Sequence, residues 1–244
     1  GKCGDNLYWN IDDENTLTIF GTGAMYDYGA NNNNKAPWRS LNTAPKSLVL
    51  EEGITYIGNY AFYNCKGFKG SLTIPNSVTN IGNYAFYGCS GFTGSLTIPN
   101  SVTNIGDWAF AYCSSFTGDL TIPNSVTTID ESAFEGCSGF TGSLTIPNSV
   151  TTIGNYAFES CSGFTRVYSS AEVAPTLGTD AFANINENAT LYYPDSSEPS
   201  YDEKGWFNYF SKRIGLGKCG DNLYWYVDDE NTLIIFGTGE MENY

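Results

Sequence analysis

Short stretches of alternating apolar and polar residues recur along the middle of the chain. In one of them, Leu72 and Ile74 flank Thr73, which is the period-2 pattern of a strand with one buried face. Pro75 then ends the strand, because proline has no N–H to donate to a neighbouring strand. The next apolar positions lie mostly three or four residues apart, as in a short extended piece followed by one helical or 3₁₀ turn: Val78, Ile81, Ala85, Phe86, Cys89 and Phe92.

This pattern repeats with a period of about 24 residues and is nearly verbatim in several copies. Residues 71–94 read SLTIPNSVTNIGNYAFYGCSGFTG, and close copies begin at residues 95, 119 and 143. A degenerate copy occupies residues 47–70, and another keeps the register through Ala181 and Phe182. Because such units bury their apolar face only against their neighbours, the sequence predicts an α/β solenoid of about six coils with a parallel β-sheet.

Both ends of a solenoid expose sheet edges and core, so they require capping units. Residues 7–11 and 17–20 are apolar runs joined by an acidic turn, which predicts a β-hairpin, and a polar loop at residues 31–34 leads to the first coil. At the other end, residues 195–204 are acidic and predict an exposed loop. Apolar residues at helical spacings then predict a short amphipathic helix that closes the array: Trp206, Phe207, Phe210 and Ile214.

The last part of the sequence is a second copy of the first. Residues 217–244 repeat residues 1–28 with 22 of 28 positions identical. This second hairpin is either the start of a further array, in which case the chain is a fragment of a longer protein, or a terminal cap, and we expect the former. The sequence therefore predicts four parts: residues 1–45, a hairpin cap; 46–194, the array; 195–216, a loop and capping helix; and 217–244, a second hairpin unit.

The repeat resembles a known family. Its pattern L-T-I-P-N-S-V-T-x-I-G-x-x-A-F-x-x-C-S-x-F, over residues 46–194, is similar to the BspA-like leucine-rich repeats of bacterial surface proteins. The opening CGDNLYWNIDDENTLTIFGTGAMYDY and the following Pro37-Trp38 resemble the segment that precedes such arrays. Each coil is one residue longer than the commoner form of this repeat, with Gly94 as the extra residue in one copy. The resemblance implies an extracellular or cell-surface adhesion module that contacts host matrix proteins, other cells or glycans.

Composition narrows the function classes. The 244 residues contain 11 Lys and Arg against 26 Asp and Glu, a net charge of −15, and residues 71–165 contain no base at all. Nucleic acid is therefore not an expected partner, because its binding requires Lys and Arg to neutralise phosphates. No apolar run reaches the ~18–20 residues that span a bilayer, so we expect no membrane insertion in this segment. The absence of histidine, of a nucleophile elbow and of a phosphate-binding loop argues against an enzyme and against a cofactor.

The seven cysteines follow the repeat rather than a disulfide framework. Five of them recur at the spacing of the repeat from Cys65 to Cys161, while Cys3 and Cys219 are equivalent positions of the two hairpins. Parallel stacking points neighbouring Cβ atoms the same way, so we expect free, buried thiols. No two cysteines have the C-x-x-C spacing that is typical of a metal site. Two acidic triplets fall in hairpin turns, where solvated charge is the default and a bound cation the alternative: Asp12, Asp13 and Glu14, and Asp228, Asp229 and Glu230.

Two columns of equivalent residues are candidate binding surfaces. The first is aromatic and is interrupted by Ser132: Tyr60, Tyr84, Trp108 and Tyr156. Tyr63 and Tyr87 begin a second aromatic position beside it. Exposed aromatic rings bind sugars by stacking or anchor partner proteins, and the alternative is that they only cover the core. The rival surface is a hydroxyl-rich strip on the outer face of the strands, which can equally be structural: Thr73, Thr97, Thr121 and Thr145.

The sequence thus favours a non-enzymatic adhesion scaffold, extracellular or at the cell surface, that binds host matrix or cell-surface proteins. Two alternatives remain open. One is a glycan-binding module that uses the aromatic column, and the other is a passive spacer that projects other domains.

Overall fold

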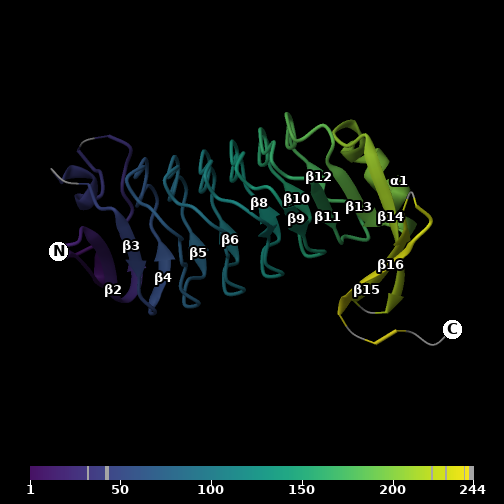
Figure 1. Cartoon of the computed structure of the whole chain (residues 1–244). Helices are drawn as coiled ribbons and strands as arrows, with labels where there is room; N and C mark the ends of the chain where they lie inside the picture. The colour runs from purple at the N-terminus through teal and green to yellow at the C-terminus, as the bar shows by residue number, and fades with distance from the viewer. Residues whose placement is uncertain (32, 42–43, 221, 229, 239, 242–244) are drawn as a thin grey trace.

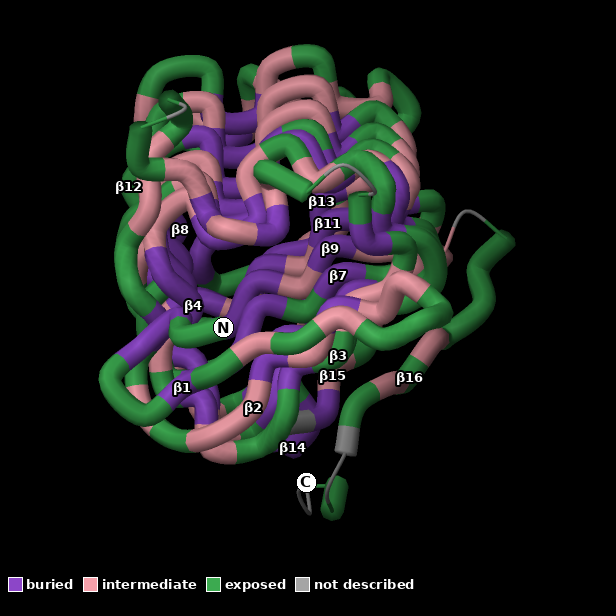
Figure 2. Tube along the Cα trace, turned by 90° about the vertical axis from the view of Figure 1, so that its left-hand side faces the viewer, coloured by how far each residue is buried: buried purple, intermediate pink, exposed green. Residues whose placement is uncertain are grey.

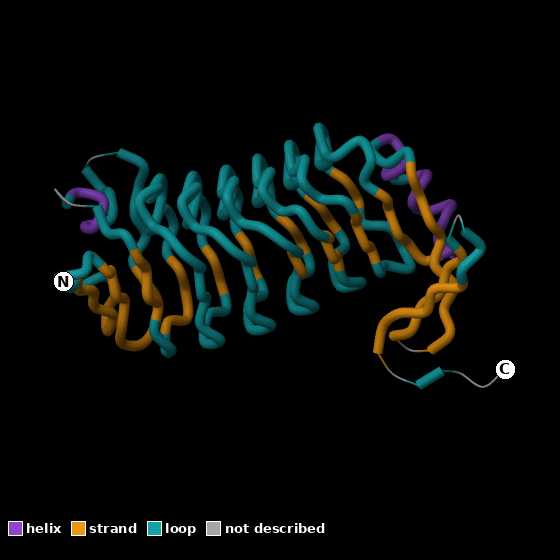
Figure 3. Tube along the Cα trace, in the orientation of Figure 1, coloured by secondary structure: helices purple, strands orange, loops and turns teal. Residues whose placement is uncertain are grey.

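The computed structural model describes residues 1–31, 33–41, 44–220, 222–228, 230–238 and 240–241. These residues form an elongated solenoid whose coils lie side by side between the two ends of the chain (Figure 1). Seen from the N-terminal end, buried backbone lies inside the coils and exposed loops surround it (Figure 2). The solenoid predicted from the repeat is confirmed, and within the described ranges helices occur only at its two ends (Figure 3).

One edge of the coils carries short parallel strands formed around the second isoleucine of the repeat. Ile81 pairs with Ile57 on one side and with Ile105 on the other. The short extended piece of the sequence pattern is therefore itself a strand. The strands of this edge are β4 (Ile54–Ile57), β5 (Asn80–Ile81), β6 (Asn104–Ile105), β8 (Thr128–Ile129), β10 (Thr152–Ile153) and β12 (Thr176–Leu177).

The other edge carries the Leu-Thr-Ile positions. Leucine and isoleucine side chains point into the core, while the threonine between them points outward. In the middle of the array this edge is reduced to a single bridge between Thr73 and Thr97. Its strands are β3 (Ser47–Leu50), β7 (Leu120–Thr121), β9 (Ser143–Ile146), β11 (Arg166–Ser169), β13 (Thr190–Pro194) and β14 (Lys212–Gly220).

The helical or 3₁₀ turn predicted for each coil is a run of separate turns with 3₁₀-type hydrogen bonds, which alternate with bonds to the next coil. Alternate N–H groups donate to carbonyls of the next coil at 2.8–2.9 Å: those of Tyr84, Phe86 and Gly88. The N–H groups between them donate three residues back within the coil, at 3.0–3.3 Å. A helix would use every N–H inside its own coil, whereas left-handed backbone at Tyr84 (φ 56°) and Gly88 (φ 67°) interrupts it and frees donors to join the coils.

Two columns of phenylalanine form the centre of the core. Phe86 stacks on Phe62 and Phe110 with ring centroids 5.1 Å and 5.3 Å apart, and Phe92 stacks on Phe68 at 5.3 Å. The cysteine column lies beside them and is buried from Cys89 to Cys161, as predicted, whereas Cys65 is only partly buried. Each of these thiols donates to a phenylalanine carbonyl of the preceding coil at 3.0–3.1 Å, so the column bonds as well as packs.

The N-terminal cap is the predicted hairpin. Strands β1 (Gly4–Ile11) and β2 (Thr16–Met25) are antiparallel, and β2 pairs in parallel with β3 of the first coil. A 3₁₀ turn, η1 (Pro37–Ser40), then places Trp38 over the end of the core. The Trp38 indole is buried, donates to the Ala61 carbonyl at 2.8 Å and stacks on Phe62 at 5.5 Å. This residue closes the first coil.

The C-terminal cap differs from the sequence prediction in two ways. Residues 195–204 are not an exposed loop, because η2 (Asp195–Ser197) and α1 (Glu198–Glu203) bury Tyr201, whose hydroxyl donates to Ser169 Oγ at 2.7 Å. The predicted amphipathic helix is also wrong: η3 (Trp206–Asn208) is a single 3₁₀ turn, and Ile214 lies in strand β14. Left-handed Gly205 (φ 78°) separates α1 from η3, and Ile214 pairs with Tyr192 of β13 instead.

The second hairpin follows directly from β14. Strands β15 (Asn222–Val227) and β16 (Leu233–Thr238) extend the sheet with antiparallel pairing, so the predicted second copy is present. Both hairpin turns are closed by the first aspartate of their triplet: Asp12 Oδ1 accepts the N–H groups of Glu14 and Thr16, and Asp228 does the same in its own turn. Asp229 of the second triplet and Asn32 of the polar loop lie outside the described residues.

Candidate functional site

The threonine strip lies where the sequence placed it, on the outer face of the Leu-Thr-Ile edge. Thr73, Thr97 and Thr121 are exposed and Thr145 is half-buried. Thr121 pairs with Thr145, which in turn pairs with Tyr168 of β11. The column therefore runs without a break in register from hydroxyl side chains into aromatic ones.

A groove follows this strip along the array. One cavity of about 650 Å³ is lined by Thr97 and Thr121, and the next, of about 460 Å³, by Thr121 and Thr145. The two cavities share the lining residues Asn100, Thr121 and Pro123, so they lie next to each other along the strip. Exposed asparagines that follow the repeat prolines line this surface: Asn76, Asn100, Asn124 and Asn148. We call this row of adjoining cavities the threonine groove.

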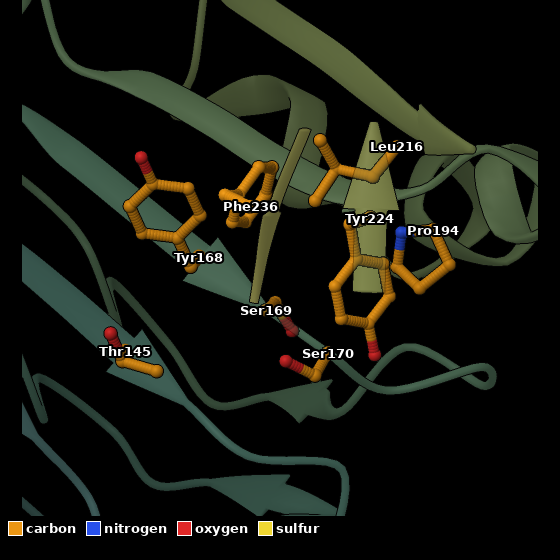
Figure 4. Close-up of a pocket in the computed structure, with 8 residues that line it drawn as sticks. All are labelled: Thr145, Tyr168, Ser169, Ser170, Pro194, Leu216, Tyr224 and Phe236. Atoms are coloured by element: carbon orange, nitrogen blue, oxygen red, sulfur yellow. The ribbon is translucent and has the colours of Figure 1, made fainter. Parts of the chain in front are cut away.

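The second hairpin closes one end of the threonine groove. A cavity of about 370 Å³ lies between the array and the hairpin, with Thr145 and Tyr168 on one side and Tyr224 and Phe236 on the other (Figure 4). Phe236 contacts the Tyr168 ring at 5.9 Å. The Tyr192 ring stacks on the Tyr168 ring with centroids 4.5 Å apart. Burial raises the pKa of the Tyr192 hydroxyl to about 12. Sequence reasoning missed this aromatic end, although the change from threonine to tyrosine at Tyr168 is a visible signal.

The aromatic column is a stacked ladder rather than a row of free rings. Tyr84 lies between Tyr60, at 4.7 Å and 8°, and Trp108, at 5.8 Å and 4°. Tyr156 stands apart, because Ser132 occupies the position between it and Trp108. Every residue at this position has left-handed backbone, with φ from 52° to 58°. Such angles place one residue of each coil at a tight turn. Because the turn recurs at the same place in every coil, the side chains at this position line up in a column.

A second row extends this ladder. Tyr63 stacks on Tyr87 at 4.9 Å, and Tyr87 contacts Tyr112 edge-on at 5.4 Å. Tyr112 was not among the sequence candidates, because it lies one position after the second aromatic column, where other coils have Gly88 and Gly136. We call Tyr60, Tyr63, Tyr84, Tyr87, Trp108 and Tyr112 together the aromatic ladder.

The aromatic ladder offers ring edges and hydroxyls more than ring faces. Both faces of Tyr84 are covered by its neighbours, and the Arg39 guanidinium lies 5.0 Å from the centre of the Tyr63 ring. Tyr112 donates its hydroxyl to the Glu135 carboxylate, which raises the pKa of that tyrosine. Sugars bind aromatic residues through open ring faces, so this arrangement suits an edge contact better than glycan stacking.

The two candidate surfaces are separate. None of the predicted aromatic residues Tyr60, Tyr84, Trp108 and Tyr156 lines the cavities of the threonine groove. Residues 71–165 contain no base, whereas Lys218 lines the threonine groove near its closed end and Arg39 lies against the aromatic ladder. Burial, followed by the nearby Asp107 carboxylate, raises the pKa of Asp130. The part of the chain with described positions contains no cluster of carboxylates and cysteines that could hold a metal ion.

No helix in the described ranges is both long enough and apolar enough to cross a membrane. The profile of the family described as BspA type leucine rich repeat region (6 copies) matches residues 41–141 and 92–204, which together make up more than half of the chain. No curated protein matches the sequence.

Two solved structures with TM-scores above 0.5 support the same fold. A leucine-rich repeat protein from Eubacterium ventriosum ATCC 27560 has a TM-score of 0.55 at 21% identity, over 80% of this chain and 66% of that chain. A leucine-rich repeat protein of T. pallidum has a TM-score of 0.54 at 20% identity, over 84% of this chain and 95% of that one. A protein from Faecalibacterium prausnitzii A2-165, described as a leucine rich cell surface protein, aligns at 22% identity with a TM-score of 0.46, over 80% and 71% of the two chains.

The fold and the family profile agree with the repeat pattern, the inward leucine and isoleucine columns and the parallel register. Leucine-rich repeat proteins of this family are generally scaffolds for protein interactions. The chain belongs to the BspA-type leucine-rich repeat family.

Proposed function

We propose that this chain is a non-enzymatic adhesion scaffold, outside the cell or at its surface, that binds host matrix or cell-surface proteins along the threonine groove. The row of adjoining cavities along one face of the array carries the proposal. It runs from Thr97 to the closed end at Phe236, so it has room for an extended segment or the edge of a folded partner.

The chemistry of the groove supports a protein partner. Its walls combine hydroxyl and amide side chains with apolar proline, and its closed end supplies the rings of Tyr168 and Phe236. Binding energy in protein interfaces is concentrated in aromatic anchors surrounded by polar rims, and this surface has both parts. The acidic array favours partners that present basic residues.

Binding of the whole chain to immobilised matrix and cell-surface proteins tests the proposal. Thr121→Lys places a long charged side chain across the groove, so we expect it to weaken binding by at least about tenfold. Thr127→Lys is the matched control, because Thr127 is exposed in the same coil and absent from the linings of the groove cavities. Equal loss of binding in both variants would place the contact elsewhere.

A glycan array run beside this protein-binding assay separates the two alternatives. Hits on a glycan array that vanish in Trp108→Ala and Tyr84→Ala would assign binding to the aromatic ladder instead. Retention by neither proteins nor glycans would leave the chain as a spacer. The stacked rings of the aromatic ladder weigh against the glycan outcome, since Tyr84 has no open face.

A further inference from the structure

The two hairpins are near-identical in sequence and in internal geometry. Trp9 pairs with Ile19 in the first hairpin, and Trp225 pairs with Ile235 in the second. The closing turns use the same aspartate bonds. Because the chain contains the same element twice, any difference in burial between the copies reports what covers each of them.

The core-facing side of the second hairpin is uncovered. Leu17 and Ile19 are fully buried in the first copy, whereas their equivalents Leu233 and Ile235 are 56% and 45% exposed. Met25 is 3% exposed and its equivalent, Met241, is 58% exposed. Leu233, Ile235 and Met241 form an apolar surface together with Trp225, and this surface lines a cavity of about 580 Å³. We call this surface the open hairpin face.

The first copy shows what belongs on such a face. Strand β2 pairs in parallel with β3, which sets Leu17 beside Leu48 and Ile19 beside Leu50. Trp38, which follows the hairpin, contacts Trp9 edge-on at 6.0 Å and covers the end of the core. In the second copy, β16 is the last strand of its sheet within the described ranges, so its outer edge carries the donors and acceptors that β2 gives to β3.

The opposite face of the second hairpin is already used. Phe236 and Tyr226 pack on the end of the array, against Tyr168 and Tyr192. The hairpin is therefore anchored on one side and open on the other. A free sheet edge is ordinarily protected by charge or proline, whereas this one presents leucine and isoleucine.

We propose that the open hairpin face is the seat of a further leucine-rich coil, which pairs in parallel with β16 as β3 pairs with β2. The occupant is defined by the first copy: an extended strand with alternate leucine or isoleucine, preceded by a tryptophan that covers Trp225. The hairpin thus closes one array and starts the next.

A fusion tests the proposal directly. In it, residues 29–216 are appended after Tyr244, so that the second hairpin is followed by the sequence that follows the first. We expect the amides of residues 233–238 to exchange at least about tenfold more slowly in the fusion than in the original chain, and Trp225 fluorescence to shift to the blue. Leu233→Asp with Ile235→Asp should abolish this protection.

The original chain supplies the control. There the Leu233→Asp and Ile235→Asp pair should leave the unfolding midpoint nearly unchanged, while Leu17→Asp with Ile19→Asp should unfold the first coil. Equal damage from both pairs would show that the face already serves the present fold, and would overturn the proposal. Unprotected residues 233–238 beside a folded appended array would also overturn it, as would concentration-dependent protection of β16 in the original chain, which would assign the face to a second copy.

Discussion

At the scale of single residues, the phenylalanine columns hold the array together. Phe110 is fully buried and stacks on Phe86 and Phe134 at 5.3 Å and 5.5 Å. Phe110→Ala should therefore lower the free energy of unfolding by about 3–5 kcal/mol, as measured by urea titration. Thr117→Ala, at an exposed position of the same coil, should change it by less than about 0.5 kcal/mol. A small effect of Phe110→Ala would mean that this column faces solvent.

The buried thiols make stability depend on alkaline pH. Burial raises the pKa of Cys137 from 9.0 to about 12, and raises those of Cys113 and Cys161 well above 9.0. Above pH 9 the unfolded thiols lose protons that the native ones keep, so their contribution is complete below that pH and is lost as pH rises toward 12. Urea titrations at about pH 8 and about pH 10.5 should show the fall in stability.

A double variant tests whether the thiols cause this fall in stability at alkaline pH. Cys113→Ala with Cys137→Ala removes two of these groups and leaves every tyrosine in place, so stability should fall less steeply with pH than in the original chain. An unchanged slope would assign the effect to tyrosines whose pKa is also raised by burial, such as Tyr192.

At the scale of elements, the sequence predicted what side-chain periodicity controls. The alternation at Leu72, Thr73 and Ile74 placed the inward and outward faces correctly, and the duplicated apolar runs placed both hairpins. Backbone conformation was harder to predict. Spacings of three and four suit a helix and a run of turns equally, and only the left-handed angles distinguish them. Nothing in the acidic composition of residues 195–204 reveals that Tyr201 is buried.

Those left-handed turns lead to a prediction at Ser132. Its φ is 52°, and its buried hydroxyl has no hydrogen-bond partner among the described residues. Ser132→Gly relieves the backbone strain and removes the hydroxyl, so it should raise the free energy of unfolding by about 1 kcal/mol after the entropy cost of glycine. Ser132→Ala removes only the hydroxyl and should gain less. Thermal and urea unfolding of both variants measures this difference. A higher free energy of unfolding for Ser132→Ala than for Ser132→Gly would contradict the prediction.

At the scale of the whole molecule, the candidate surfaces were only partly predictable. The threonine column follows from the repeat, because alternation fixes its face. The closed end of the threonine groove does not, since it needs Phe236 of the second hairpin to meet Tyr168, which lies far from it in the sequence. Similarly, the repeat predicted aromatic columns at Tyr60 and Tyr63, but the stacking that covers the face of Tyr84 depends on side-chain angles that spacing does not fix.

The array should tolerate loss of a complete coil, because each coil contacts only its neighbours. Deletion of residues 95–118 joins Gly94 to Asp119 and sets β5 beside β8 with leucine, isoleucine and phenylalanine columns still aligned. We expect a folded chain of lower stability, with one cooperative urea transition and an m-value reduced by about a tenth. Deletion of residues 95–106 alone sets polar positions against the core columns and should abolish the cooperative transition. If both deletions unfolded the chain alike, the coils would not act as interchangeable units.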